Sequence, residues 1–232
     1  MPDRPWFWRQ TWHDLLFAHW PVATAAVRHL VPAPVTIQEH GGRSWVGLVP
    51  FRMSGVTLRG LPAVPGLSAF PEMNLRLYVE LDGRPGVWFI SLDAAHALAV
   101  WTARRFVHLP YFRASMSVRH EGELVRYASE RRGRGPRVAF HAAYRPAGPV
   151  FAAAPGSLAH FLTERYCLYT RMPDGAIRRL EIHHAPWPLQ PAEADIETNL
   201  VAEPQGIRLP PTPPVLYFSR RIDVVGWGLE RT

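Results

Sequence analysis

This chain has 232 residues, and all 26 of its lysine-plus-arginine positions are arginine, which gives a formal net charge of +7. Because a guanidinium stays protonated in proteins, no side chain here can act as a nucleophilic amine, and chemistry through a lysine imine is excluded. A hydrophobic content of 47%, with 9 Trp and 11 Phe, excludes a disordered chain.

The first 30 residues show no export or membrane signal. Residues 1–5 (MPDRP) lack the hydrophobic region of a signal peptide, and no stretch of the chain approaches the roughly 18 apolar residues of a membrane span. We therefore expect a cytoplasmic protein with no membrane partner. Without repeats or linker-like segments, residues 1–232 are predicted to form a single domain. The apolar spacing in residues 12–30 predicts helix, ended by Pro32 and Pro34.

The next part of the chain predicts mostly hairpins. Residues 36–39 and 44–53 flank a glycine-containing turn, and 72–81 and 87–92 flank another at 82–86. Between these hairpins, residues 60–71 are rich in Pro and Gly and predict a loop. Residues 93–106 are Ala-rich and open with Asp93, a good N-cap, which predicts a helix.

The second half of the chain is again mainly β. A three-stranded meander is predicted over 113–120, 122–131 and 137–145, followed by a helix over 157–165 capped by Ser157. Further predicted elements are strands at 166–170 and 176–184, a short helix at 191–199 and a closing strand at 215–225. The sum is a mainly β (α+β) fold, largely antiparallel, with a few covering helices.

The arginine-rich run at 131–137 is the one dense cluster of positive charge. Such a run could neutralise phosphates of a nucleic acid. It also falls at the predicted tip of a hairpin, where a solvated turn is the ordinary explanation. The other arginines are scattered, so we do not expect nucleic acid as a partner.

The strand at 72–79 carries the strongest candidate site. Its period of two places Glu72, Asn74, Arg76 and Tyr78 on one face and apolar residues on the other. The polar face could simply be solvated. Alternatively, it lines the interior of a barrel or cone and contacts a ligand. Glu72 and Arg76 are separated by about 13 Å of strand and cannot pair directly, so each needs another partner or a ligand.

A second candidate lies between the predicted helix and the meander, at residues 108–114. Tyr111 could hydrogen-bond a ligand or donate a proton, and Arg113 could clamp an anionic group. Equally, Tyr111 could plug the end of a barrel while Arg113 is an ordinary surface residue. Both interpretations remain open.

Metal and cysteine chemistry find little support in the sequence. The 11 His residues include no pair with zincin spacing, and the adjacent His183 and His184 point to opposite faces of a strand. We therefore expect no metal site and no cofactor. The single cysteine, Cys167, lies in an apolar run and is predicted to be a buried structural thiol.

Several segments together resemble the YqjF-like, or DUF2071, family of uncharacterised proteins, which is placed in the acetoacetate decarboxylase-like superfamily. The matching stretches run through the chain in order: 15–20 (LLFAHW), 45–51 (WVGLVPF), 72–79 (EMNLRLYV), 86–94 (GVWFISLDA), 109–111 (LPY), 162–166 (LTERY) and 184–189 (HAPWPL). The resemblance implies an antiparallel β cone or barrel that encloses a cavity, with peripheral helices.

The superfamily resemblance also locates the missing lysine. In the decarboxylases a lysine forms a Schiff base with a β-keto acid, and its pKa is lowered by desolvation and a second cation. The segment that looks equivalent here is 110–114, so Tyr111 and Phe112 stand where two lysines would. Glu72 resembles the position of an active-site glutamate, which makes it the best acid or base candidate.

Two functions follow as hypotheses. In the first, the cavity acts on a small carbonyl or carboxylate compound without an imine, with Glu72 handling protons, Arg76 or Arg113 holding an anion and Tyr111 hydrogen-bonding the ligand. In the second, the protein is a non-catalytic small-molecule sensor or binding module. In either case the partner is a small molecule, and a homo-oligomer is compatible with the sequence.

Overall fold

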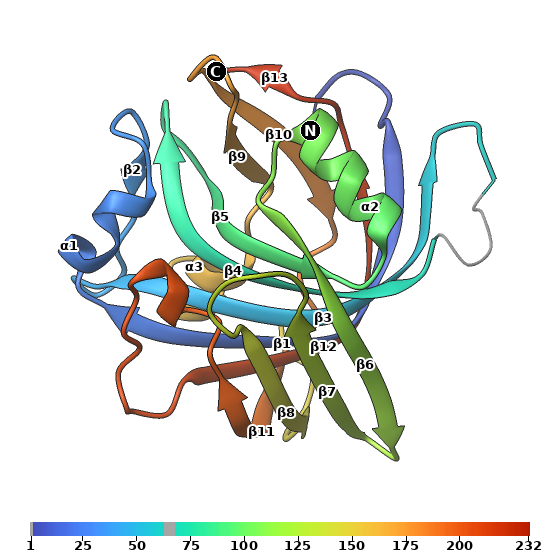
Figure 1. Ribbon diagram of the computed structural model, residues 1–232, viewed down its shortest axis with the longest axis vertical. Coiled ribbons are helices and arrows are strands. Elements are labelled where there is room, and N and C mark those ends of the chain that lie inside the picture. Colours follow the sequence, from blue (N-terminus) through green and yellow to red (C-terminus); the bar gives the residue numbers. More distant parts are fainter. Residues whose placement is uncertain (1, 63–67) are drawn as a thin grey trace.

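The computed structural model describes residues 2–62 and 68–232, which form 13 strands and a few short helices (Figure 1). The strands are β1 (Trp8–Val22), β2 (Thr36–Ile37), β3 (Ser44–Leu58), β4 (Phe70–Leu81), β5 (Arg84–Ala94), β6 (Tyr111–Glu121), β7 (Leu124–Arg131), β8 (Ala139–Pro146), β9 (Cys167–Arg171), β10 (Ile177–His184), β11 (Gln190–Asn199), β12 (Val215–Gly226) and β13 (Glu230–Arg231). The helices are α1 (Thr24–Val27), α2 (Ala97–Thr102) and α3 (Leu158–Thr163), with the single turns η1 (Arg28–Leu30), η2 (Ala103–Val107) and η3 (Glu203–Gln205). The predicted mainly β fold is confirmed.

The strands close into two rings that share one wall. The wall has the order β5-β4-β3-β1-β12. One ring is completed by β9 and β10, and the other by β6, β7, β8 and β11. In Figure 1 the long, curved strands of the wall cross the middle, with the two closures on opposite sides. Because each face of the wall meets a different closure, both faces are buried.

Strand β4 shows how the shared wall uses the alternation of its sequence. The apolar side chains Met73, Leu75 and Leu77 belong to the main hydrophobic core, together with Tyr127 and Phe140 of the second ring. The opposite, polar face of β4 faces the interior of the first ring. The hypothesis that this polar face is simply solvated is therefore wrong.

The predicted helix over 12–30 is wrong, because most of this segment is the 15-residue strand β1. Its six residues from Leu15 to Trp20 are all buried. A strand covered on both faces is apolar almost throughout, so the alternation that marks a strand is lost and apolar spacing can mimic a helix. Only the short α1 and η1 turns follow β1.

The predicted helix at 191–199 is also wrong, since these residues form β11. Their burial alternates along the strand. Ala192, Ala194 and Ile196 pack against the main core, while Glu193 and Asp195 lie on the other side. A period of two was therefore present in the sequence.

Two further predictions need correction. Segment 36–39 does not pair with β3, because β2 pairs with β4 through Thr36–Glu80 and Ile37–Val79. Asp93 does not cap a helix, because β5 continues through it. Helix α2 begins later, where the Nδ1 atom of His96 accepts a hydrogen bond from the backbone N–H of Ala99.

The remaining elements agree with the predictions within a few residues. The hairpin β4–β5, the meander β6–β7–β8, the pair β9–β10 and the strand β12 are all present. Helix α3 is capped by Ser157, whose hydroxyl accepts from the His160 N–H. Of the loop predicted at 60–71, residues 63–67 lie outside the described residues, and β4 already begins at Phe70.

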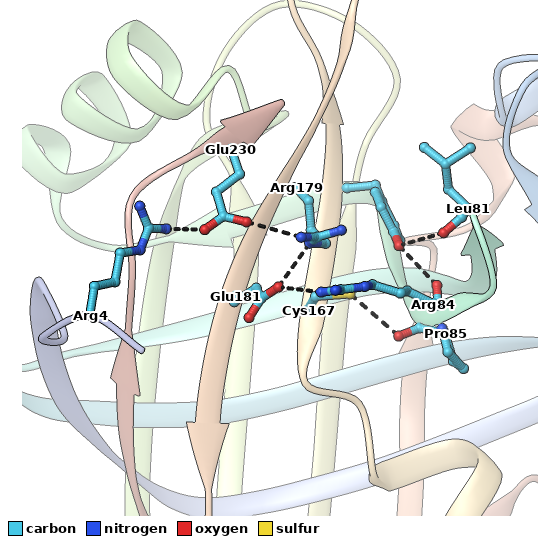
Figure 2. A network of polar contacts seen from close by, with 9 residues as sticks. Arg4, Leu81, Arg84, Pro85, Cys167, Arg179, Glu181 and Glu230 are labelled. Carbon is cyan, nitrogen blue, oxygen red and sulfur yellow. Dashed lines mark hydrogen bonds and ion pairs between the residues drawn. The ribbon is translucent and has the colours of Figure 1, made fainter. Parts of the chain in front are cut away.

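A chain of ion pairs ties the two ends of the chain to β10 (Figure 2). Glu230 of β13 pairs with both Arg4 and Arg179, and Glu181 pairs with Arg179 and with Arg84 of β5. These contacts join β5, β10 and β13 on the outside of the first ring. No helix in the described part of the chain is long and apolar enough to cross a membrane.

Candidate functional site

A cavity of about 810 Å³ lies inside the ring that β9 and β10 close. Side chains of β1, β3, β4, β5, β9 and β10 form its wall, and α2 and η2 contribute at one end. Most of this wall is apolar and aromatic. The polar side chains among its buried lining are Thr57, Glu72, Asn74, Thr163, Arg165 and His184.

Glu72 and Tyr111 form the acidic part of the cavity. Glu72 is 4% exposed, and the hydroxyl of Tyr111 donates a hydrogen bond of 2.8 Å to its Oε2 atom. Burial raises the pKa of Glu72 to about 8; the bond from Tyr111 opposes the rise and the nearby charge of Asp93 adds to it. Burial and the neighbouring Glu72 raise the pKa of Tyr111 well above its usual value. At neutral pH both groups therefore hold their protons.

A buried ion pair lies behind this acidic part. Asp93, at the end of β5, accepts a 2.8 Å bond from Nε of Arg131 on β7. The guanidinium of Arg131 also lies over the ring of Phe112, 3.9 Å from its centroid. Tyr127 adds a 2.7 Å bond to the backbone carbonyl of Glu72. These contacts come from the second ring and hold the Glu72 segment in place.

Asn74 and Arg76 continue the polar face of β4 into the cavity. The Oδ1 atom of Asn74 is buried and has no hydrogen-bond partner among the described residues. Arg76 donates from Nε to the Tyr78 hydroxyl (3.1 Å) and from Nη2 to the carbonyl of Leu162 (3.1 Å). No carboxylate of residues 2–62 or 68–232 forms an ion pair with Arg76.

Arg165 supplies a second buried cation beside Arg76. It is 7% exposed and donates to the carbonyl of Phe161 (2.7 Å) and to Oε1 of Gln38 (2.6 Å). Burial lowers the pKa of Arg165 to about 10, so it stays charged at neutral pH. Gln38 in turn donates to Glu80, which links Arg165 to a carboxylate only indirectly. With Glu72 protonated, Arg76 and Arg165 are the charged groups that the described residues contribute to the lining.

Tyr78 and His19 lie behind Arg76 and orient it. Tyr78 is fully buried and does not itself line the cavity; its hydroxyl lies 2.5 Å from Nε2 of His19. Burial, with the charge of Arg76, lowers the pKa of His19 well below its usual value. A neutral His19 adds no further positive charge beside Arg76 and Arg165.

The structure brings together most of the predicted site residues. Glu72, Asn74, Arg76 and Tyr111 line one cavity, and Tyr78 contacts it through Arg76. Arg113 does not join them: it is exposed on β6 and borders a separate, shallow recess. The hypothesis that Arg113 clamps an anion at this site is wrong, because its exposed side chain is not part of the cavity lining, whereas Tyr111, two residues before it, is.

Sequence reasoning missed Arg165, Thr163 and His184 as lining residues. Arg165 and Thr163 lie in the quoted stretch 162–166, and His184 opens the stretch 184–189. Their presence in stretches shared with the family was the available signal, because Arg165 stands between Glu164 and Tyr166 and no apolar pattern around it marks it as buried. Cys167 is buried in the cavity wall, where its Sγ atom lies 3.3 Å from the carbonyl of Pro85.

The structure gives less support to the other candidate sites, the arginine-rich run and a metal site. In the arginine-rich run, Arg131 is occupied by Asp93 and Arg137 by Glu130. Across the described ranges 2–62 and 68–232, no group of three or more His, Cys, Asp or Glu side chains is arranged to hold a metal ion.

Comparison with known proteins identifies the family and the fold. A family model described as DUF2071, an uncharacterised conserved protein, matches residues 9–223. The chain is 46% identical over 231 residues to the uncharacterised protein YqjF of Bacillus subtilis (strain 168), covering 100% of this chain and 95% of that protein.

Solved structures share the fold at low sequence identity. The enduracididine biosynthesis enzyme MppR, complexed with pyruvate, superposes with a TM-score of 0.67 at 13% identity, covering 100% of this chain and 91% of that one. The acetoacetate decarboxylase of Legionella pneumophila gives a TM-score of 0.66 at 12% identity, with coverages of 100% and 92%. The chain therefore belongs to the DUF2071 family of uncharacterised conserved proteins and has an acetoacetate decarboxylase-like fold.

Proposed function

We propose that the cavity binds a small carbonyl or carboxylate compound and acts on it by proton transfer at Glu72, without a covalent imine. The observation that carries this proposal is the pairing, on one face of β4, of a buried, protonated Glu72 with Arg76, a cation that has no carboxylate partner among the described residues. A protonated acid and an unpaired guanidinium in one apolar cavity suit an anionic ligand that needs a proton.

Each group has a distinct task in this scheme. Arg76 pairs with the ligand's carboxylate, and Arg165 adds positive potential beside it. Asn74, between Glu72 and Arg76, offers its free Oδ1 atom to a donor of the ligand. Glu72 gives its proton to the carbonyl oxygen of the ligand.

Tyr111 is a positioning residue for Glu72. Its own pKa is raised well above the usual value, so it keeps its proton and donates the 2.8 Å bond to Oε2 whether Glu72 is neutral or ionised. This bond stabilises the carboxylate that remains after proton donation. The imine route of the decarboxylases is closed because the sequence has no lysine.

The fold neighbours support the class of ligand. MppR was solved with pyruvate bound, and the other neighbours include acetoacetate decarboxylase, whose name gives a β-keto acid as its substrate. Both ligands carry a carboxylate and a carbonyl group. At 12–13% identity the likeness concerns the fold, so the argument for this chain rests on its own Glu72 and Arg76.

A second candidate function is favoured by the predominantly apolar wall of the cavity. A wall of this kind suits a non-catalytic binding module or sensor, which needs affinity and no proton transfer. The two functions differ in whether a bound compound is consumed.

The test is a thermal-shift screen with carboxylates and 2-oxo and 3-oxo acids, followed by NMR of each stabilising compound incubated with the protein. We expect at least one oxo acid to stabilise the wild type, Arg76→Met to abolish that stabilisation and Glu72→Gln to bind without turnover. Arg113→Ala is the control and keeps both ligand binding and turnover, because Arg113 is outside the cavity. Binding without consumption by the wild type favours the binding module, and stabilisation unaffected by Arg76→Met contradicts the anion site.

A further inference from the structure

The mouth of the cavity is lined by exposed apolar side chains. Among the described residues, eight large apolar side chains are exposed, and five of them also line the cavity: Phe7, Leu58, Leu61, Leu98 and Phe106. A sixth, Trp101, packs edge-on against Phe106 with ring centroids 6.0 Å apart. We call Phe7, Leu58, Leu61, Leu98 and Phe106 the mouth. Apolar side chains gathered at the opening of a pocket mark a surface that meets apolar atoms of a ligand or partner.

The polar groups lie progressively deeper from this mouth. Strands β3 and β4 pair in register, with Met53 opposite Phe70, Phe51 opposite Glu72 and Gly47 opposite Arg76. Leu58 continues β3 beyond this register toward the mouth. Arg76 lies six residues after Phe70, which corresponds to about 20 Å of strand. Arg76 therefore marks the deep end of the cavity, and Glu72 lies part of the way in.

Apart from Glu72 and Asn74, the walls between Arg76 and the mouth are mainly apolar. Trp12, Phe51, Met53, Val56 and Phe70 line this passage. Trp12 packs edge-on against Phe51, with ring centroids 5.6 Å apart, so these side chains present mainly hydrocarbon to the passage; Nε1 of Trp12 is a buried donor without a partner among the described residues. A ligand that fills the passage needs hydrocarbon there.

The volume also exceeds what a three- or four-carbon acid needs. The cavity of about 810 Å³ equals the volume of about 27 water molecules at about 30 Å³ each. A ligand with an acid head alone would leave most of the apolar wall in contact with water, which is unfavourable.

Resting on the proposed function, we infer that the ligand is an amphiphile: a carboxylate bound at Arg76 with an unbranched hydrocarbon tail that runs past Glu72 to the mouth. The tail buries the apolar passage, and its end meets the exposed side chains at the opening. This assigns the mouth a role in chain-length selection.

The test is calorimetric titration with the straight-chain carboxylates from butanoate to hexadecanoate, each kept below its critical micelle concentration. We expect Kd to fall about fourfold for each added methylene, the factor for moving one CH₂ group out of water. Ala103→Trp, which places a large ring in the lining beside the mouth, flattens this dependence for the longer acids. Ala97→Trp is the matched control on α2, since Ala97 is exposed and does not line the cavity, and it keeps the wild-type dependence.

Arg76→Met separates this inference from the proposed function. It weakens all the acids by a common factor and leaves the fourfold step per methylene intact. A chain-length dependence with no effect of Arg76→Met contradicts the carboxylate site but keeps the tail passage. A Kd that does not change with chain length overturns the amphiphile, even if Arg76 proves essential.

Two other outcomes also count against the amphiphile. If none of the acids binds, both the head site and the tail passage are wrong. If binding of the long acids weakens as the protein concentration rises, the mouth is covered by a second copy of the chain, and its exposure is explained without a ligand tail.

Discussion

Tyr111 and Glu72, 39 residues apart in the chain, meet inside the cavity through a 2.8 Å hydrogen bond from the phenol to Oε2. The two strands that carry them are not neighbours: β4 pairs with β5, and β5 pairs in parallel with β6 through Leu92 and Tyr111. A tyrosine that donates to a buried acid keeps that acid in one orientation. Several measurable properties of the protein follow from this contact and from the groups around it.

Glu72→Gln removes a pH dependence of stability. The pKa of Glu72 is about 8 in the folded protein against 4.5 when exposed, so between these values only the unfolded chain loses the proton. The contribution of Glu72 to the free energy of unfolding is fully present below pH 4.5. It decreases by up to roughly 5 kcal/mol as the pH rises to 8. The check is urea denaturation from pH 5 to 9, comparing wild type with Glu72→Gln.

The difference between the two proteins isolates Glu72 from the histidines. Burial lowers the pKa of His19 and His184, so their contribution grows as the pH rises, and it cancels in the comparison. Glu123→Gln, at an exposed surface pair, is the control and keeps the wild-type profile. Parallel profiles for wild type and Glu72→Gln would show that Glu72 ionises normally.

Tyr111→Phe raises the pKa of Glu72 further. The hydrogen bond from Tyr111 is the main influence that lowers this pKa against the effect of burial, and phenylalanine removes it without changing the ring. The pH at which the unfolding free energy stops falling moves above 8, and the loss of the bond costs about 1–3 kcal/mol. NMR titration of the Glu72 carboxyl carbon measures the shift directly, and an unchanged midpoint would refute the role given to Tyr111.

Arg131→Met destabilises the protein strongly because it leaves Asp93 buried without a counter-charge. Asp93 is 1% exposed, and breaking one partner of a buried pair costs about 3–5 kcal/mol. The double variant Asp93→Asn/Arg131→Met recovers most of this loss. Arg137→Met, at the exposed pair with Glu130, changes stability little. Equal effects of Arg131→Met and Arg137→Met on the urea midpoint would contradict this account.

Asp93→Asn also lowers the pKa of Glu72, since the charge of Asp93 is one of the causes that raise it. The same NMR titration detects this shift, in the direction opposite to that of Tyr111→Phe. A midpoint that moves upward or not at all would show that the two carboxyls do not interact.

Gly47→Ala displaces the groups that orient Arg76. A Cβ atom at Gly47 would lie 2.9 Å from Nε2 of His19 and 3.0 Å from the hydroxyl of Tyr78, which is closer than packed atoms tolerate. The crowding costs about 1–3 kcal/mol and weakens ligand binding through the Tyr78–Arg76 bond. Gly228→Ala meets no atom within 4 Å and is the control. Equal melting temperatures for the two variants would be incompatible with the packing around His19.

The sequence predicted hairpins best where the segment that connects the two strands has a clear turn signal. The turns of β4–β5, β6–β7 and β9–β10 carry Gly, Asp or Pro at the positions that need them, and these pairs are present. It failed at β1 and β11. The shared wall buries β1 on both faces, so its apolar run lacks alternation, and the alternation of β11 was weakened by its small alanines.

The polar face of β4 could be recognised from the sequence, and Glu72, Asn74 and Arg76 do share one cavity. The residues from other elements that surround this face could not be predicted in the same way. Arg165, which follows α3, lies close enough to Arg76 for their charges to interact, and Arg131 of β7 donates to Asp93. Spacing along one strand carries no information about which distant strand closes the ring.

By itself, the sequence determined that no lysine imine can form, that the fold is mainly β and that β4 has a polar face. Only the tertiary structure decided that this face is enclosed, that Arg113 is outside it and that Glu72 stays protonated. The physical reason is that alternation is a local property of the backbone, whereas burial arises when two closures cover opposite faces of the same wall. Desolvation by that closure changes the pKa of Glu72, and it acts only in the assembled ring.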